Sequence, residues 1–299
     1  MTDTRTAPSD GARAPLAGTG PVVVAIGGVD PASVLRAARM LAPRAGGGIL
    51  AVSVLELPPA SAESADPRFL PPGYVDERQA ELADRLTTQL RAVGGSATTW
   101  HTRVSDGEPA FALTDLARMV DAPLLVMGIG RHRTLDRLCG SETTLQAIRI
   151  APCPVLAVHP HLDGPFHDVV AAVDFSPASV FAAQVALPLL APEATLHLVH
   201  MWQAASGSER YAESTMNRLW YFSQTLSIPE GVEVRTIVRE GRTASGVLDY
   251  AAAHHADLIV AGRHGLDPLE RLVVGSETTA ILRGAGRSVL IAPEPASQK

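Results

Sequence analysis

A stretch in the C-terminal part of the chain carries the residues best suited to chemistry. Its glycines, Gly262, Gly265 and Gly275, have the spacing G-x2-G-x9-G, and Ser276 follows the last of them. An apolar run at residues 258–261 precedes the glycines; it is too short for a helix and typical of a strand buried on both faces. After Ser276 the pattern becomes helical.

This order of strand, glycine loop and helix start predicts an anion-binding site. The N–H groups in the first turn of a helix have no partner within the helix, and the helix dipole is positive there. Glycines allow a phosphate group to come close to these N–H groups. The stretch is therefore typical of a nucleotide-binding loop, although tight turns without a ligand would use the same glycines.

A modified version of the stretch lies in the first half of the chain, where the segment Gly-Ser-Glu-Thr-Thr occurs verbatim for a second time. An identity of five residues, at the same place in the same order of elements, indicates an internal duplication. The candidate residues of this first copy are Met127, Gly128, Gly130, Gly140 and Ser141.

Apolar runs and helical patterns alternate through both halves. Strands are predicted at residues 22–26, 49–55, 98–104, 124–127 and 154–158, and again at 169–174, 195–201, 232–238, 258–261 and 288–291, with helices between them. This alternation predicts an α/β fold with parallel sheets, right-handed crossovers and helices on both faces. We therefore expect two tandem, doubly wound, Rossmann-like domains of five parallel strands, at residues 21–160 and 166–295, joined near residues 159–167.

The composition narrows the class of protein. A chain of 299 residues is long enough for two ordinary domains, and its net charge of −6 gives no overall basic surface for nucleic acid. Residues 1–20 have no apolar core segment, so we expect a disordered arm rather than a secretory signal, and a cytoplasmic protein with no membrane partner. Cys139 and Cys153 are isolated and form no metal-type pair.

The lysine content excludes one common kind of phosphate site. Lys299, at the end of the chain, is the only lysine. A Walker-type phosphate loop needs a lysine directly after its glycines, so P-loop chemistry is excluded, as is catalysis through an internal lysine.

In a doubly wound sheet, ligands lie beyond the carboxyl ends of the strands. Both glycine loops and Asp174 are expected at these strand ends.

On these motifs the sequence resembles a tandem universal stress protein of the kind that binds ATP, over nearly all of residues 22–293. The resemblance implies adenine-nucleotide-hydrolase-like domains that pair through their last strands, within one chain in tandem members, and further dimerisation is possible. It implies that ATP with Mg²⁺ is the cofactor, and that the protein is a nucleotide-dependent regulatory module that contacts an unidentified protein in the stress response.

The resemblance also implies roles for residues of the second half. Asp174 would hold the ribose or adenine side, and the backbone near Met201 would contact adenine. Ribose and phosphates would lie against the glycine loop, where Arg263 and His264 add charge only if they turn inward. The full candidate set is Asp174, Met201, Ala261, Gly262, Arg263, His264, Gly265, Gly275, Ser276, Glu277 and Thr278.

The first half departs from the pattern. The spacing from Gly128 to Gly140 is one residue shorter than that from Gly262 to Gly275, so either the middle glycine is displaced to Gly130 or an arginine takes its place. In addition, a glycine rather than an aspartate ends the first strand. We expect this degenerate site to bind nucleotide more weakly than the second or not at all.

Several alternatives stay open from the sequence. Asp174 could serve only as the N-cap of the helix that begins near residue 177. The protein could be a nucleotide-independent dimerisation scaffold, or a slow ATPase, since bound ATP with Mg²⁺ needs only a positioned water. No catalytic residues and no metal ligands stand out; His197 and His200, three apart in a strand, would face opposite sides of the sheet.

Overall fold

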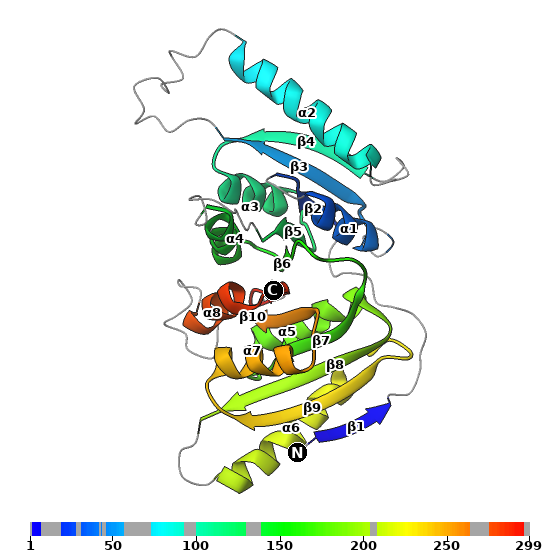
Figure 1. Cartoon of the computed structure of the whole chain (residues 1–299), viewed down its shortest axis with the longest axis vertical. Coiled ribbons are helices and arrows are strands. Elements are labelled where there is room, and N and C mark those ends of the chain that lie inside the picture. Colours follow the sequence, from blue (N-terminus) through cyan, green and yellow to red (C-terminus); the bar gives the residue numbers. More distant parts are fainter. Residues whose placement is uncertain are drawn as a thin grey trace.

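The computed structural model describes residues 2–6, 19–27, 31–41, 43, 46–56, 73–92, 100–129, 139–203, 208–263 and 275–295. Its described strands form one eleven-stranded sheet in the order β1-β9-β8-β7-β10-β11-β6-β5-β2-β3-β4 (Figure 1). Strands β2 to β6 of the first half form one end of this sheet, and strands β7 to β11 of the second half form the other, where the N-terminal β1 is added at the edge.

The first half has the predicted alternation of elements. They are β2 (Val22–Ala25), α1 (Pro31–Leu41), β3 (Ile49–Leu55), α2 (Tyr74–Ala92), β4 (Trp100–Asp106), α3 (Pro109–Met119), β5 (Leu125–Gly128), α4 (Cys139–Ile150) and β6 (Val155–Val158). The five strands are parallel in the order β4-β3-β2-β5-β6. Strand order therefore reverses between β2 and β5, as in a doubly wound sheet.

The second half repeats this arrangement. Its elements are β7 (Phe166–Ala172), α5 (Pro177–Ala186), the 3-10 helix η3 (Leu187–Leu189), β8 (Leu190–Trp202), α6 (Ser208–Thr225), β9 (Glu233–Glu240), α7 (Thr243–Ala253), β10 (Leu258–Gly262), α8 (Ser276–Gly284) and β11 (Ser288–Ala292). The parallel order is β9-β8-β7-β10-β11, so strand order reverses between β7 and β10. The prediction of two tandem five-stranded parallel sheets is confirmed.

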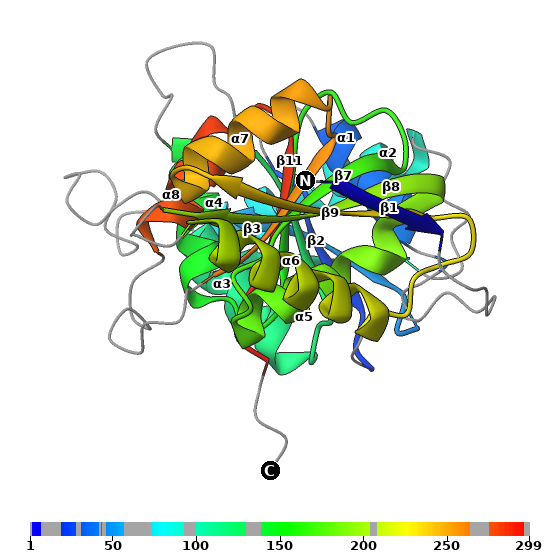
Figure 2. The same cartoon turned by 90° about the horizontal axis from the view of Figure 1, so that it is seen from below.

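The two halves join through their last strands. β11 pairs antiparallel with β6, with Ile291 opposite Val155 and Val289 opposite Ala157. Both strands are buried along their whole length, because each face of the sheet is covered by helices. Leucines from α1, α2 and α6 pack in one buried cluster, while α3, α4, α7 and α8 contribute to the other. Figure 2 shows α6 and α7 on opposite sides of β9.

The N-terminal segment differs from the predicted disordered arm. Residues Thr2–Thr6 form β1, which pairs antiparallel with β9 so that Thr2 lies opposite Ile237 (Figure 1). β9 is otherwise the edge of the sheet, where unpaired backbone groups accept any added strand whatever its side chains. Residues 7–18 lie outside the described residues.

The link between the halves is anchored to the first half. The hydroxyl of Ser33 on α1 donates to the carbonyl of Pro160, and Arg36 Nε donates to the carbonyl of Leu162 at 2.8 Å. β7 begins at Phe166, so it includes the last residues of the expected connector. Within the described parts of the chain, no helix has the length and apolar character needed to cross a membrane.

Candidate functional site

A pocket opens at the carboxyl ends of β7, β8 and β10, where strand order reverses in the second half. It encloses about 760 Å³ of empty space, including the part open to solvent. Eight of the predicted residues line it: Asp174, Met201, Ala261, Gly262, Gly275, Ser276, Glu277 and Thr278. The structure therefore brings together residues that lie far apart in the sequence, at the place expected for a ligand in such a sheet.

Asp174 lies just beyond the end of β7 and faces this pocket. Its Oδ1 accepts a hydrogen bond from the N–H of Ser176 at 2.9 Å. The N-cap of α5 is Ser176, whose hydroxyl accepts the N–H of Ser179 at 3.2 Å. The alternative that Asp174 is the N-cap is therefore wrong. Phe175, directly after it, has a φ of 64°, a conformation that is unusual for a bulky residue and is found mainly at turns and functional sites.

Gly262, the last residue of β10, is glycine for a packing reason. A Cβ at this position would lie 2.8 Å from the backbone nitrogen of Ser179 and 3.0 Å from the carbonyl carbon of Ala178. The first turn of α5 therefore packs directly on the end of β10. A side chain here would push the helix away, so the fold itself requires this glycine.

Gly275, in contrast, is not required by the fold. Its φ of −52° is available to any residue. The nearest atom to a Cβ at this position would be the carbonyl oxygen of Arg263, at 3.9 Å. Gly275 lines the pocket and is the N-cap of α8, where it makes no side-chain hydrogen bond. Nothing in the packing of the described residues explains the absence of a side chain.

The start of α8 presents N–H groups to the pocket. Ser276 is exposed and begins the helix, so N–H groups of this first turn have no partner within the helix. Thr278 is buried, and its hydroxyl donates to the carbonyls of Gly262 at 3.1 Å and of Arg263 at 3.3 Å. Its hydroxyl therefore holds α8 against the end of β10.

Glu277 is also engaged by the protein. Its Oε2 accepts the N–H of Ala244 at 2.5 Å, in the first turn of α7. The N-cap of α7, Arg242, makes no side-chain hydrogen bond, so the carboxylate of Glu277 takes over the capping function from a neighbouring helix. Glu277 thus fixes the spacing of α7 and α8 on either side of the pocket.

Arg263 turns away from the pocket. Its Nη1 lies 3.1 Å from the carbonyl oxygen of Ile148, 3.3 Å from that of Arg149 and 2.8 Å from that of Ala151, all at the end of α4 in the first half. Carbonyl groups at a helix C-terminus lack helical partners and attract cations. Burial lowers the pKa of the Arg263 guanidinium. Arg263 therefore does not turn inward, which was the condition for it to add positive charge near the ligand.

The remaining predicted residues of this site are outside the described part of the chain. They are His264 and Gly265, and most of the loop at residues 263–274 lies there too. The Pro- and Ser-rich loop at residues 57–72 also lies outside it, and so does Gly130 of the first half.

Sequence reasoning missed several residues that line the pocket. Ser179 and Thr243 add hydroxyl groups from the first turns of α5 and α7, while Val199 and Val247 add apolar surface. None belongs to a motif, because each sits in an ordinary strand or helix pattern. One signal could have indicated Ser179 and Thr243: each lies in the first turn of a helix that follows a predicted strand, and such turns gather at the same edge of the sheet.

The glycine loops of the two halves have equal length in the structure. The hydroxyl of Thr144 donates to the carbonyl of Gly128 at 3.2 Å, and these two residues are 16 apart. The hydroxyl of Thr278 makes the same bond to Gly262, also 16 residues away. The strand pairing agrees with this alignment of the two halves. Leu125 pairs with Val155 in the first half, and Ile259 pairs with Val289 at the equivalent place in the second half.

The verbatim Gly-Ser-Glu-Thr-Thr segments are consequently offset by one residue. With Thr144 in the place of Thr278, Ser141 occupies the place of Gly275 and Gly140 comes one position earlier. α4 accordingly begins at Cys139, ahead of its glycine, whereas α8 begins after Gly275. The sequence pattern predicts a helix that begins at residue 141, whereas in the structure α4 begins at residue 139.

The first half also lacks a carboxylate in the place of Asp174. Val23 pairs with Leu125 as Val170 pairs with Ile259, so Gly27 stands where Asp174 stands. The side chain of Met127 is buried in the core between the sheet and its helices. The described part of the first half therefore has neither the carboxylate nor the glycine N-cap of the second-half pocket.

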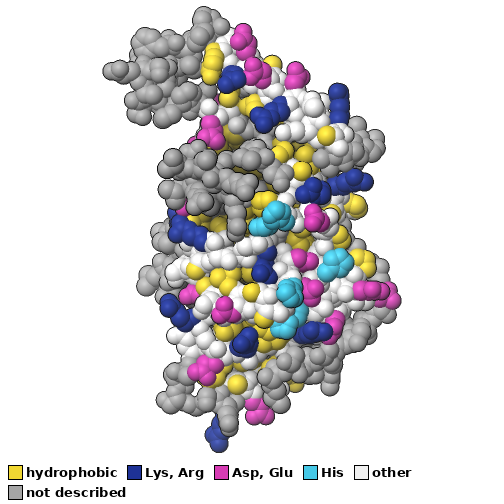
Figure 3. Space-filling model, in the orientation of Figure 1, with side chains coloured by type: hydrophobic (Ala, Val, Ile, Leu, Met, Phe, Trp, Pro, Cys, Tyr) yellow, Lys and Arg dark blue, Asp and Glu magenta, His cyan; other side chains and the backbone are white. Residues whose placement is uncertain are grey.

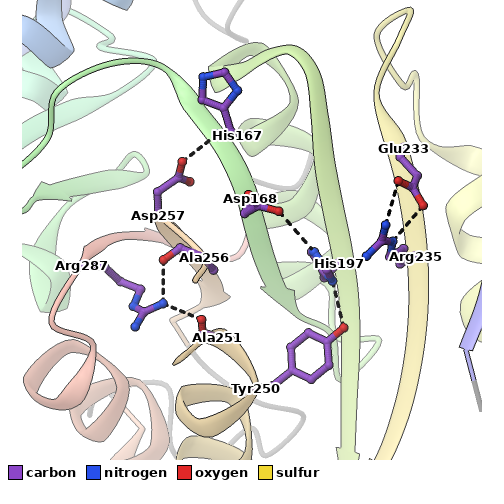
Figure 4. Close-up of polar contacts among 10 residues, drawn as sticks. All are labelled: His167, Asp168, His197, Glu233, Arg235, Tyr250, Ala251, Ala256, Asp257 and Arg287. Atoms are coloured by element: carbon purple, nitrogen blue, oxygen red, sulfur yellow. Dashed lines mark hydrogen bonds and ion pairs between the residues drawn. The ribbon is translucent and has the colours of Figure 1, made fainter. Parts of the chain in front are cut away.

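A separate cluster joins the buried His197 of β8 to Tyr250 of α7 and to His254, which ends that helix. Nδ1 of His197 lies 2.9 Å from the hydroxyl of Tyr250, and its Nε2 lies 3.9 Å from Oδ1 of Asp168 (Figure 4). Burial, with the nearby charges of His254 and Arg235, lowers the pKa of His197 to about 4.

His200 lies on the opposite face of the sheet, as predicted from the spacing. Its Nδ1 lies 2.7 Å from the carbonyl oxygen of Val173 and so carries a proton. Within the described residues, no group of three or more His, Cys, Asp or Glu side chains is arranged to hold a metal ion. On the face shown in Figure 3, basic and acidic side chains are interspersed around the histidines.

Comparison with known proteins matches most of the chain to one family. A family model described as the universal stress protein family matches residues 19–159 and again residues 165–293. A universal stress protein of Methanocaldococcus jannaschii is 35% identical over 65 residues, which cover 22% of this chain and 38% of that protein. The match therefore spans well under half of the length of this curated relative.

Solved structures share the fold over nearly the whole chain. A universal stress protein from Archaeoglobus fulgidus has a TM-score of 0.68 at 14% identity, covering 94% of this chain and 98% of its own. A putative universal stress protein from Pseudomonas aeruginosa has a TM-score of 0.65 at 14% identity, covering 93% and 94%. At this identity the likeness concerns the fold alone.

Proposed function

Since this chain belongs to the universal stress protein family, we propose that the pocket of its second half binds ATP together with Mg²⁺. The bound nucleotide regulates which surface the protein offers to a partner in the stress response. The described residues of the first half include neither a carboxylate in the place of Asp174 nor a glycine in the place of Gly275, so we expect the first half to bind nucleotide more weakly or not at all.

The observation that carries the proposal is Gly275. A glycine that lines a pocket, has an ordinary φ and leaves open space around a Cβ serves no purpose in the packing of the described residues. The absent side chain leaves the N–H groups at the start of α8 accessible. Access to a helix N-terminus is what binding of a phosphate group requires.

The walls of the pocket suit the other parts of an adenine nucleotide. Val199, Met201 and Val247 provide apolar surface for a flat base, and the strand end next to them offers backbone groups. The carboxylate of Asp174 can accept a hydrogen bond from a ribose hydroxyl. These groups and the start of α8 line one continuous pocket, so a single ligand can reach all of them.

The charge of the pocket supports the proposal that Mg²⁺ accompanies the nucleotide. Among the described residues that line it, Asp174 and Glu277 carry negative charge and no side chain carries positive charge. A triphosphate beside two carboxylates needs a counter-charge, and Mg²⁺ is commonly bound through one or two carboxylates plus substrate phosphates.

Calorimetric titration of the full chain with Mg·ATP tests the proposal. We expect saturable binding of one nucleotide per chain, and a thermal shift that grows with nucleotide concentration. A titration with Mg·GTP serves as the control for base recognition. A folded sample that shows neither heat nor thermal shift at millimolar Mg·ATP would contradict the proposal and favour a nucleotide-independent scaffold.

A further inference from the structure

Arg263 connects the second-half pocket to the first half of the chain. Its backbone continues β10 past Gly262, because its N–H donates to the carbonyl of Ala292 at 2.7 Å. Its own carbonyl accepts the hydroxyl of Thr278, which holds the start of α8. One residue thus contacts β11, α8 and, through its side chain, the end of α4.

The guanidinium of Arg263 acts as a cap for a helix of the other half. It lies within 3.3 Å of three carbonyl oxygens at the end of α4, where the backbone hydrogen-bond pattern of the helix leaves carbonyl groups without donors. A partly buried guanidinium that loses these hydrogen-bond partners is strongly destabilised, because water does not fully replace them. The end of β10 is therefore held in a fixed position relative to α4.

A second arginine holds the other end of α4. Arg283, in the last turn of α8, has its Nη2 2.9 Å from Oε1 of Glu142, in the first turn of α4. Both side chains of this ion pair are largely exposed, so it contributes little by itself. Together the two arginines attach α4 to both sides of the glycine loop: Arg263 lies at the start of the loop, and Arg283 lies in the helix that follows it.

Among the described residues, no matching contact runs in the opposite direction. The first-half residue in the place of Arg263 is Ile129, whose N–H donates to the carbonyl of Val158 at 2.9 Å just as Arg263 donates to Ala292. The isoleucine side chain has no donor to offer the end of α8. The backbone is therefore alike at these two positions, but of the two side chains only that of Arg263 caps a helix of the other half.

From this asymmetry we infer that Arg263 is a positioning residue of the nucleotide site, and that α4 of the first half is the support on which it acts. The inference rests on the proposed function. Through this contact the first half holds the start of the glycine loop at the distance from α8 that phosphate binding needs. Nucleotide affinity and the order of the last turn of α4 are therefore coupled, and the coupling is reciprocal.

The first experiment compares nucleotide affinity in full-length variants. Arg263→Gln removes the charge and shortens the side chain, and we expect the Kd for Mg·ATP to rise at least about fivefold, the lower end of typical couplings between sites. Arg263→Lys, which keeps the charge, should recover part of this loss. The matched control is Arg36→Gln, which removes an arginine-to-carbonyl bond between α1 and the connector, away from the pocket, and should change the Kd less than about twofold.

The second experiment tests the coupling in the opposite direction, by following the end of α4 while nucleotide binds. Ala151 N–H donates to Ala147 at 2.8 Å, so this amide reports the last turn of α4. Saturating Mg·ATP should slow hydrogen exchange there in the wild-type chain, and should fail to do so in Arg263→Gln.

The outcomes separate the two proposals. If the wild-type chain does not bind Mg·ATP, the proposed function and this inference both fall. If it binds, but Arg263→Gln binds equally well or exchange in α4 ignores the nucleotide, only the positioning role of Arg263 is overturned. A rise in Kd that Arg36→Gln reproduces would likewise contradict it, because a general loss of stability would then explain both.

Discussion

Replacing Gly275 by serine separates what the fold needs from what the ligand needs. Among the described residues other than its chain neighbours, a Cβ at this position would come no closer than 3.9 Å to any atom, and the backbone conformation suits any residue. Serine is also a better N-cap than glycine, by a few tenths of a kcal/mol. The first half already has serine, Ser141, at the corresponding place. We therefore expect the free energy of unfolding to stay within about 0.5 kcal/mol of wild type.

Nucleotide binding should respond differently. A phosphate held by the N–H groups of α8 occupies the space next to Gly275, and a side chain there displaces it. Losing one hydrogen bond to a charged group costs about 1.5–3 kcal/mol. The Kd for Mg·ATP should therefore rise about 10- to 100-fold.

The assay combines calorimetric titration with urea unfolding on the same preparations. Gly46→Ser is the matched control, because a Cβ at Gly46 also meets open space but lies in the first half, far from the pocket. It should alter neither quantity. Wild-type affinity in Gly275→Ser would refute the reasoning, since the glycine would then serve no ligand.

Packing and burial lead to three more predictions. Gly262→Ala should lower the free energy of unfolding by about 1–3 kcal/mol in urea titrations, because the new Cβ would meet backbone at 2.8 Å. Gly128→Ala should lower it less, because the Cβ there meets a Val34 methyl group at 3.2 Å, and equal losses in the two variants would contradict the packing argument. Because the pKa of His197 falls from 6.5 to about 4 in the folded state, the unfolded chain binds more protons between these values. Stability should thus be flat above pH 6.5 and decrease as the pH falls toward 4, by at most about 1.4 kcal/mol per pH unit, and His197→Gln should flatten this slope in urea titrations at several pH values. Burial raises the pKa of Cys153 to about 12, so in a Cys139→Ser background mass spectrometry should find this thiol unmodified by iodoacetamide at pH 8 until the protein unfolds.

The alternation of strands and helices was predictable because it depends on local patterns. Runs such as residues 258–261 are apolar on both faces, and short glycine- or proline-marked turns separate them from helices. β1 was not predictable, because its pairing depends on the exposed backbone of β9 rather than on its own composition.

The members of the second-half site could be predicted, but their contacts could not. Asp174 and Gly275 follow from motifs that place them at strand and helix ends. The direction of Arg263 depends on the antiparallel pairing of β6 and β11, which brings α4 within its reach and leaves no trace near residue 263. The one-residue offset of the repeated segment was hidden for a similar reason, since identical letters favour an alignment that strand pairing and the Thr144 hydrogen bond overrule.

A crystal structure of the full chain grown with Mg·ATP would show directly whether the second-half pocket binds the nucleotide. We expect one nucleotide in the second half, with phosphates at the start of α8 and the ribose beside Asp174. An empty second-half pocket at millimolar Mg·ATP, or a nucleotide bound only in the first half, would contradict it.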